Sequence, residues 1–439
     1  MMEFILALAL VFTAATQFRL PGIPIGPGEL GLVVWIVGFF LKTVVFGTQP
    51  VSRAVPALLS FWVAFALALS IGMMTAMATR EAFDPELVVH DAIAYVLVAV
   101  LSCLCAATPM RLRRVSWFVL IGGAVSLSLQ LANGFGIFRV PGIDPWFWER
   151  FRGWSDNPNQ LAILCLIIAL TALYLAETAT NLIGRLAAIL LLIPSLVAGR
   201  LSQSDAFMLA MCTAVPVWIV VKLIVWLNDK RPGLSLRASF AQLMLMAAPA
   251  LILCCAPLLL SNAQEVRGLV MGLAKNNGAQ AAAEADLRIT LWHQAIERGI
   301  ESGMLGLGPG PHLHIPPSIV AGRASTGKQP LNLAHPDQNG TMNYEAHNTV
   351  LDVFTQGGLL AVASFIWIMI RATSRAYRSR SAGLVALIMG AAIFLMTGNI
   401  VRQPIFWFAI VLCLTAPVSS LERRRPLRAV QSHDRQSPA

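Results

Sequence analysis

The chain has few charged residues. Only 12% of its 439 residues are Asp, Glu, Lys or Arg, whereas 57% are hydrophobic, and its mean hydropathy is +0.69. A soluble globular domain carries about 25% charged residues. The composition therefore excludes a soluble domain and indicates a protein that lies in a membrane.

Apolar runs of about 18 to 20 residues recur along nearly the whole chain, and each is long enough to cross a bilayer as a helix. No Lys or Arg precedes the first run, and Glu3 stands where a basic segment would be. We therefore expect a retained first helix rather than a signal peptide. The predicted fold class is an all-α polytopic membrane protein. We expect about twelve spans, at residues 3–18, 30–47, 54–74, 87–107, 115–132, 159–176, 182–199, 206–227, 240–261, 347–370, 382–399 and 404–421.

The polar segments contain no cysteine. All seven cysteines fall within apolar runs, where thiols behave as small buried hydrophobes. No disulfide framework is expected.

The formal net charge of +10 comes from basic clusters beside the span ends. Even numbers of predicted spans separate the clusters, so the positive-inside rule places all of them and both termini in the cytoplasm. This arrangement orients the protein and argues against nucleic-acid binding. The clusters are Arg111, Arg113 and Arg114; Lys230, Arg231 and Arg237; Arg371, Arg375, Arg378 and Arg380; and Arg423, Arg424, Arg425 and Arg428.

The predicted spans and their orientation divide the chain into four parts. Residues 1–261 hold nine spans, 262–346 form a large periplasmic loop, 347–421 hold three spans, and 422–439 form a basic cytoplasmic tail. Residues 133–158 also face outside. Within the large loop, residues 284–302 have the spacing of an amphipathic helix near the membrane surface, with Leu291 and Ala295 on its apolar face.

The large loop concentrates the histidines. His293, His312, His314 and His335 lie in it, and His347 follows directly. Residues 303–317 are rich in Gly and Pro and are expected to be neither helix nor central strand. His312 and His314 have a spacing that suits metal ligation. Because no acidic or Cys partner is suitably spaced, exposure to solvent or contact with an acceptor is the favoured interpretation, and no metal site is predicted.

Three motifs lie on the predicted outer face. RFRGWSDNPNQLA runs from Arg150 to Ala162, where Asn157 or Asn159 can cap the next helix. Arg288 and Trp292 precede the sequence GLGPG. EAHNTVL contains His347 and Asn348 and is followed by Gly357, Gly358 and Leu359.

In this order, the motifs resemble those of the O-antigen ligase and polymerase superfamily, best between about residues 191 and 408. The resemblance implies a fold similar to the C-type glycosyltransferases and a place in the bacterial inner membrane. It also implies transfer of a glycan from an undecaprenyl-pyrophosphate carrier to lipid A-core or to a growing glycan, without a cofactor. The implied partners are this donor, the acceptor and membrane lipids.

The resemblance also implies site residues. His347 would be the general base and Arg288 would contact the pyrophosphate, while Asn348 would orient the site. An imidazole suits a base near neutral pH, and a guanidinium suits phosphate oxygens. Arg288 could instead be an interfacial arginine with its charge in the headgroups, and His347 only an exposed residue at a helix start.

The chain departs from the family where a Ser-x-Ser-Arg motif is usual. Here the stretch reads GRLSQSD, with Asp205 in place of the arginine. Arg200, or Arg150 or Arg152, could supply the missing charge, and the first motif could also serve as an aromatic belt. The predicted substrate-binding residues are Arg200, Arg150, Arg152, Asn348, Asn157 and Asn159.

Several functions compete. A ligase is favoured over a polysaccharide polymerase because a single large loop with the AHN helix is typical of it. A multi-span transporter or flippase would place ionisable residues at the bilayer midplane. Here the charges cluster at span ends and the span interiors are nearly uncharged, with His90 and Asp91, near the start of a span, as the main exceptions. A membrane scaffold would not need the histidines of the loop.

Overall fold

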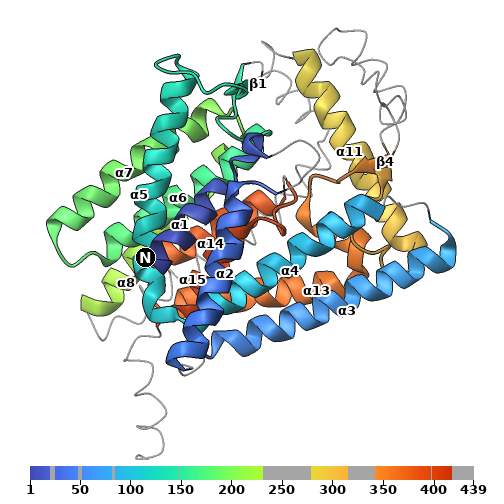
Figure 1. Ribbon diagram of the computed structural model, residues 1–439, viewed down its shortest axis with the longest axis horizontal. Helices are drawn as coiled ribbons and strands as arrows, with labels where there is room; N and C mark the ends of the chain where they lie inside the picture. Colours follow the sequence, from blue (N-terminus) through green and yellow to red (C-terminus); the bar gives the residue numbers. More distant parts are fainter. Residues whose placement is uncertain are drawn as a thin grey trace, which may run out of the picture.

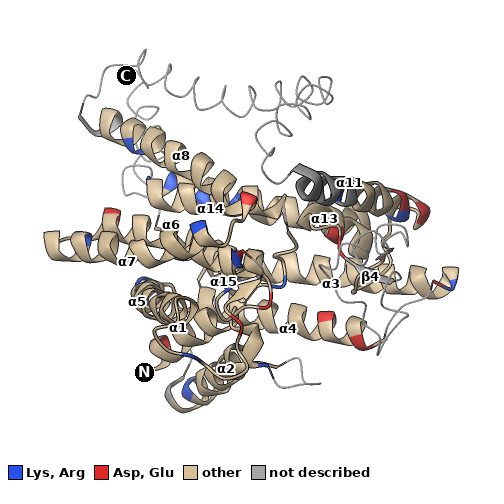
Figure 2. Cartoon of the chain, turned by 90° about the horizontal axis from the view of Figure 1, so that it is seen from above, with Lys and Arg blue, Asp and Glu red and all other residues tan. Residues whose placement is uncertain are grey.

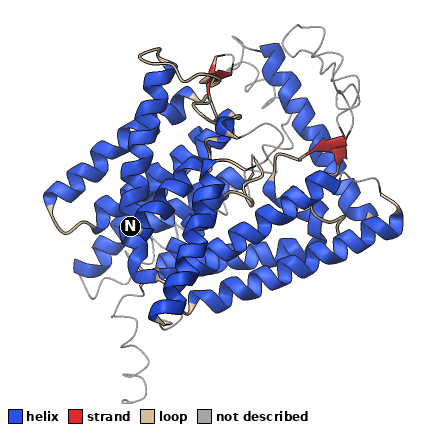
Figure 3. Ribbon diagram, in the orientation of Figure 1, coloured by secondary structure: helices blue, strands red, loops and turns tan. Residues whose placement is uncertain are grey.

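The computed structural model describes residues 1–19, 25–47, 52–81, 85–147, 149–230, 278–314, 342–396 and 398–417. These residues form a bundle of α-helices with two short antiparallel strand pairs at its edge (Figures 1 and 3). The helices are α1 (Met2–Phe12), α2 (Pro27–Phe46), α3 (Ala54–Thr79), α4 (Pro85–Ala107), α5 (Pro109–Gly134), α6 (Pro158–Thr178), α7 (Leu182–Leu201), α8 (Asp205–Lys230), α11 (Gly278–Glu301), α13 (Thr349–Arg378), α14 (Ala382–Leu395) and α15 (Pro404–Thr415), with a 3-10 turn at Thr16–Phe18. The strands are β1 (Trp146–Phe147), β2 (Arg150–Phe151), β3 (Leu313–His314) and β4 (Met342–Tyr344).

The helices agree with the predicted spans. Eight helices in the described ranges are long and apolar enough to cross a membrane. Each predicted span coincides with a helix, except residues 240–261, which lie outside the described residues. The protein is therefore a multi-pass membrane protein. The total of twelve spans, the periplasmic loop and the likeness to C-type glycosyltransferases stay predictions.

Three helices, α1, α14 and α15, are shorter than the runs that predicted them. In α15, all residues from Pro404 to Leu414 are buried, and the helix packs on α13, α4 and α6. This run is therefore apolar because it lies in the centre of the bundle. Helix α1 ends at Phe12 because the chain then turns. The Gln17 amide donates to the carbonyls of Asp144 (3.0 Å), Gly153 (3.2 Å) and Ser155 (2.7 Å), tying this turn to the β1–β2 segment.

Charged residues lie mainly near helix ends and on α11, and the helix middles are largely uncharged (Figure 2). The start of α5 and the last turns of α13 line one cavity, which contains Pro109, Arg371 and Arg378. Two of the four basic clusters therefore lie at the same end of the bundle, as the span parity predicts. The side of the membrane to which this end belongs stays a prediction.

Helix α13 is kinked at Gly358, which has φ 61° and ψ −159°. The Gly-rich segment after α11 fits against this kink. The amides of Leu307 and Gly308 donate to the carbonyls of Thr355 and Gln356, both at 2.8 Å, and the amide of Leu359 donates to Met304 O at 3.0 Å. These bonds satisfy backbone groups that the broken helix would otherwise leave unpaired. Residues 303–314 are therefore an ordered loop with a structural role.

Gly358, at the kink, and Gly303, in the loop that fits against it, allow a matched pair of variants. A Cβ at Gly358 would lie within 2.0 Å of Met304 O, whereas a Cβ at Gly303, which also has positive φ, meets nothing within 4 Å. We expect Gly303→Ala to cost about 1–2 kcal/mol, from its left-handed backbone alone. Gly358→Ala should cost more, because the loop must move away. Thermal unfolding of both purified variants tests this prediction, and equal losses would contradict it.

Candidate functional site

Helix α11 contacts the segment just before His347. The Trp292 indole donates to Ala346 O at 3.0 Å. Leu291 and Ala295 are fully buried in a small cluster with Leu313 and Ala346. The predicted amphipathic helix is therefore confirmed, but these two residues of its apolar face pack on protein and not on lipid. This packing fixes α11 against the start of α13.

Hydrogen bonds fix both chain neighbours of His347, Ala346 and Asn348. The Ala346 amide donates to Asp352 Oδ1 at 2.6 Å, and the Asn348 side chain caps α13 by accepting from the amides of Val350 and Leu351. His347 itself has φ 51° and is partly exposed. A left-handed backbone costs about 1–2 kcal/mol for a residue with a Cβ. The surrounding bonds therefore hold the backbone of His347 in this conformation.

Arg288 precedes Trp292 by one turn of α11. Residues four apart share a helix face, so Arg288 lies on the face that Trp292 turns toward Ala346. Its side chain is partly buried and forms no hydrogen bond or ion pair with the other described side chains. The structure thus brings Arg288 and His347, which are 59 positions apart in the sequence, onto contacting segments.

Arg402, which sequence analysis missed, holds this region together. Its guanidinium pairs with Asp91 of α4 and with Glu345, two residues before His347. Burial lowers the pKa of Arg402, but the Glu345 and Asp91 carboxylates outweigh it and raise the pKa above its ordinary value. An arginine between two apolar spans on the predicted outer side is unusual under the positive-inside rule. This exception could have drawn attention to Arg402 in the sequence. Asp91, which a transporter could have used, is bound in this pair.

Arg150 and Arg152 belong to a second cluster at the β1–β2 hairpin. Arg150 donates to Ser202 O and to Asn159 Oδ1, both at 3.1 Å, and so joins the end of α7 to the start of α6. Arg152 donates to the backbone and side chain of Asp144. Asn157 caps α6 by accepting from the Asn159 amide at 2.8 Å, which confirms the predicted cap. These contacts give Arg150, Arg152 and Asn157 structural roles.

Arg200 lies in the last turn of α7 and is exposed. Its guanidinium makes no hydrogen bond or ion pair within the described ranges, which leaves this group available to a ligand. Nearby, Ser204 is 1% exposed, and its hydroxyl has no hydrogen-bond partner among the described residues. Of the arginines that could replace the one missing at Asp205, Arg200 is the best placed to contact an anion.

His312 is buried, which contradicts exposure to solvent, one of the two interpretations favoured for it, and leaves contact with an acceptor untested. It is 8% exposed, and its Nε2 lies 2.8 Å from Gly308 O. Burial lowers its pKa, although the hydrogen bond to Gly308 opposes this shift. The His312 ring therefore stabilises the Gly-rich loop through its hydrogen bond to Gly308 O. His335 and the side chain of His314 are outside the described part of the structure, and no group of three His, Cys, Asp or Glu within that part could hold a metal ion.

Comparison with known proteins adds independent support. Residues 164–366 match a family model described as O-Antigen ligase. This range includes Arg200, Arg288, His347 and Asn348, whereas the β1–β2 cluster precedes it. No curated protein matches the chain. This match, over a little under half of the chain, supports the resemblance of the motifs and of the multi-span fold to the O-antigen ligase and polymerase superfamily.

Proposed function

We propose that this chain is an inner-membrane glycosyltransferase that moves a glycan from an undecaprenyl-pyrophosphate carrier to an acceptor at the periplasmic face. We favour the ligase reaction, in which the acceptor is lipid A-core. The observation that carries the proposal is the hydrogen bond from Trp292 to Ala346. It joins the helix that bears Arg288 to the residue before His347, and we infer from this contact that one substrate reaches both side chains.

In the proposed step, an acceptor hydroxyl oxygen attacks the anomeric carbon of the donor sugar. The new glycosidic bond forms as the bond between that carbon and the pyrophosphate oxygen breaks. His347 takes the hydroxyl proton, and the carrier leaves as polyprenyl pyrophosphate. Arg288 stabilises the negative charge that grows on the leaving phosphate. Asn348 acts indirectly, because it caps α13 beside His347.

Donor binding needs cationic groups that are not already paired. Arg298 pairs with Glu81 at 3.0 Å, and Arg402 pairs with Asp91 and Glu345. Arg288 and Arg200 have no such pair among the described residues. We assign Arg288 to the leaving pyrophosphate and Arg200 to a more distant part of the donor.

Arg288→Gln should lower transfer about tenfold to a hundredfold, because a hydrogen bond to a charged group contributes roughly 1.5–3 kcal/mol. Arg288→Lys keeps the charge but loses the bidentate contact, so an intermediate rate is expected. His293→Gln on the same helix is the control, since His293 is exposed. Transfer assays with purified lipid-linked donor would measure the rates. Wild-type transfer by Arg288→Gln would refute the role of this residue.

Deleting the gene separates the ligase from the polymerase. If the protein is a ligase, full-length chains should accumulate on the carrier while capped lipopolysaccharide is lost. Single repeat units on the carrier would instead identify a polymerase. Complementation with His347→Asn tests whether the same site is responsible, because this variant should not restore the wild-type glycans.

A further inference from the structure

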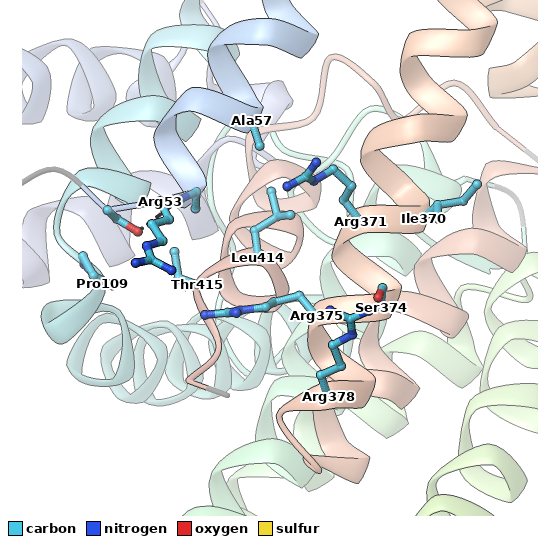
Figure 4. A pocket seen from close by; sticks show the side chains of 12 residues that line it. Arg53, Ala57, Pro109, Ile370, Arg371, Ser374, Arg375, Arg378, Leu414 and Thr415 are labelled. Atoms are coloured by element: carbon cyan, nitrogen blue, oxygen red, sulfur yellow. Dashed lines mark hydrogen bonds between the residues drawn. The ribbon is translucent and has the colours of Figure 1, made fainter. Parts of the chain in front are cut away.

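A cavity of about 630 Å³ lies at the other end of α13 from His347. Its walls come from the starts of α3 and α5, the last turns of α13 and the end of α15 (Figure 4). From the kink at Gly358 to Arg378, α13 runs for 20 residues, and at about 1.5 Å per residue this part alone is some 30 Å long. The cavity is therefore remote from the proposed transferase site and needs its own explanation.

The cavity is strongly basic. Arg53, Arg371, Arg375 and Arg378 line it, and no acidic residue does so within the described part of the chain. Arg53 from α3 and Arg375 from α13 extend toward one another (Figure 4). Like charges brought together near a low-dielectric bundle repel one another. A bound anion would offset that repulsion.

The rest of the lining suggests which anion. Ala57, Ile370 and Leu414 add an apolar wall, while Ser374 and Thr415 add hydroxyl groups. The outer flank beside the cavity is also apolar, since Leu59 is 50% and Ile370 62% exposed. Acyl chains could lie along this flank while a headgroup occupies the basic end. A fully soluble anion would make no use of the apolar surface.

We propose that this cavity binds the phosphate headgroup of an anionic phospholipid. Guanidinium groups bind phosphate oxygens through paired hydrogen bonds, and the cavity brings four arginines together. Basic pockets between membrane helices have this chemistry. The volume is in the range of small-molecule sites. The lipid would join α3 to α13 at the end opposite the transferase site.

The test uses the full-length protein in zwitterionic nanodiscs, titrated with cardiolipin as the probe. Native mass spectrometry counts bound cardiolipin and gives its affinity. Arg371→Gln/Arg375→Gln should weaken binding about tenfold to a hundredfold, because charge-assisted hydrogen bonds are lost. Arg114→Gln/Arg380→Gln removes the same charge outside the cavity lining and should bind cardiolipin as the wild type does.

Two results would overturn the proposal. The first is equal cardiolipin affinity in the two double variants. The second is displacement of cardiolipin by millimolar inorganic pyrophosphate, which would assign the cavity to a soluble anion. If the double variant does not fold, Arg371→Gln and Arg375→Gln are tested singly, and wild-type affinity in both would exclude the site.

Discussion

His347→Asn is expected to abolish glycan transfer while the protein stays folded. Asparagine tolerates the left-handed backbone that His347 adopts at φ 51°, but its amide cannot accept the hydroxyl proton. Loss of a general base lowers rates about 10²- to 10⁴-fold. Transfer assays on the purified variant measure the rate, and thermal unfolding checks the fold.

His347→Ala provides the matched comparison. Alanine also lacks a base, so its transfer rate should fall as far as that of His347→Asn. It should unfold more easily, since alanine is less suited to positive φ. If His347→Asn transferred glycan at the wild-type rate, the imidazole would have only a structural role.

Arg402→Met is expected to destabilise the protein strongly. Its removal leaves Asp91, whose side chain is 2% exposed, as a buried carboxylate without its guanidinium partner, in contact with only the partly exposed His90 ring at 3.2 Å among the described side chains. Breaking one partner of a buried ion pair costs about 3–5 kcal/mol. The substitution should also lower the rate of glycan transfer, because Arg402 pairs with Glu345, which lies beside the residues that position His347. Thermal unfolding should show the lower stability, and transfer assays should show the lower rate.

A double variant separates charge from packing. Adding Asp91→Asn to Arg402→Met removes the uncompensated charge and should recover part of the lost stability. If the double variant were no more stable than Arg402→Met, the ion pair with Asp91 would not be what stabilises this region.

The sequence predicted helices better than their ends. Hydropathy marks α14 and α15 as long spans, but both are shorter because burial among other helices, not contact with lipid, makes them apolar. The helix around Leu291 followed from its periodicity. Its docking on Ala346 through Trp292 did not, because periodicity shows that a face is apolar without showing what covers it.

The candidate site was predictable only in part. Motif order led to the prediction of Arg288, His347 and Asn348 as site residues, and the cap at Asn157 followed from local chemistry. Three features depend on contacts between distant segments and could not be predicted. They are the pairing of Arg402 with Asp91 and Glu345, the burial of His312, and the bonds that commit Arg150 to Ser202 and Asn159.

The side of the membrane on which each end of α13 lies can be measured directly. Single cysteines replace Arg288, His347 and Arg378 in a cysteine-free background, and cells with a permeable outer membrane are treated with a membrane-impermeant maleimide. We predict that positions 288 and 347 react in intact cells, and that position 378 reacts only after the inner membrane is opened. Reaction of positions 288 and 347 from opposite sides would contradict a shared periplasmic site.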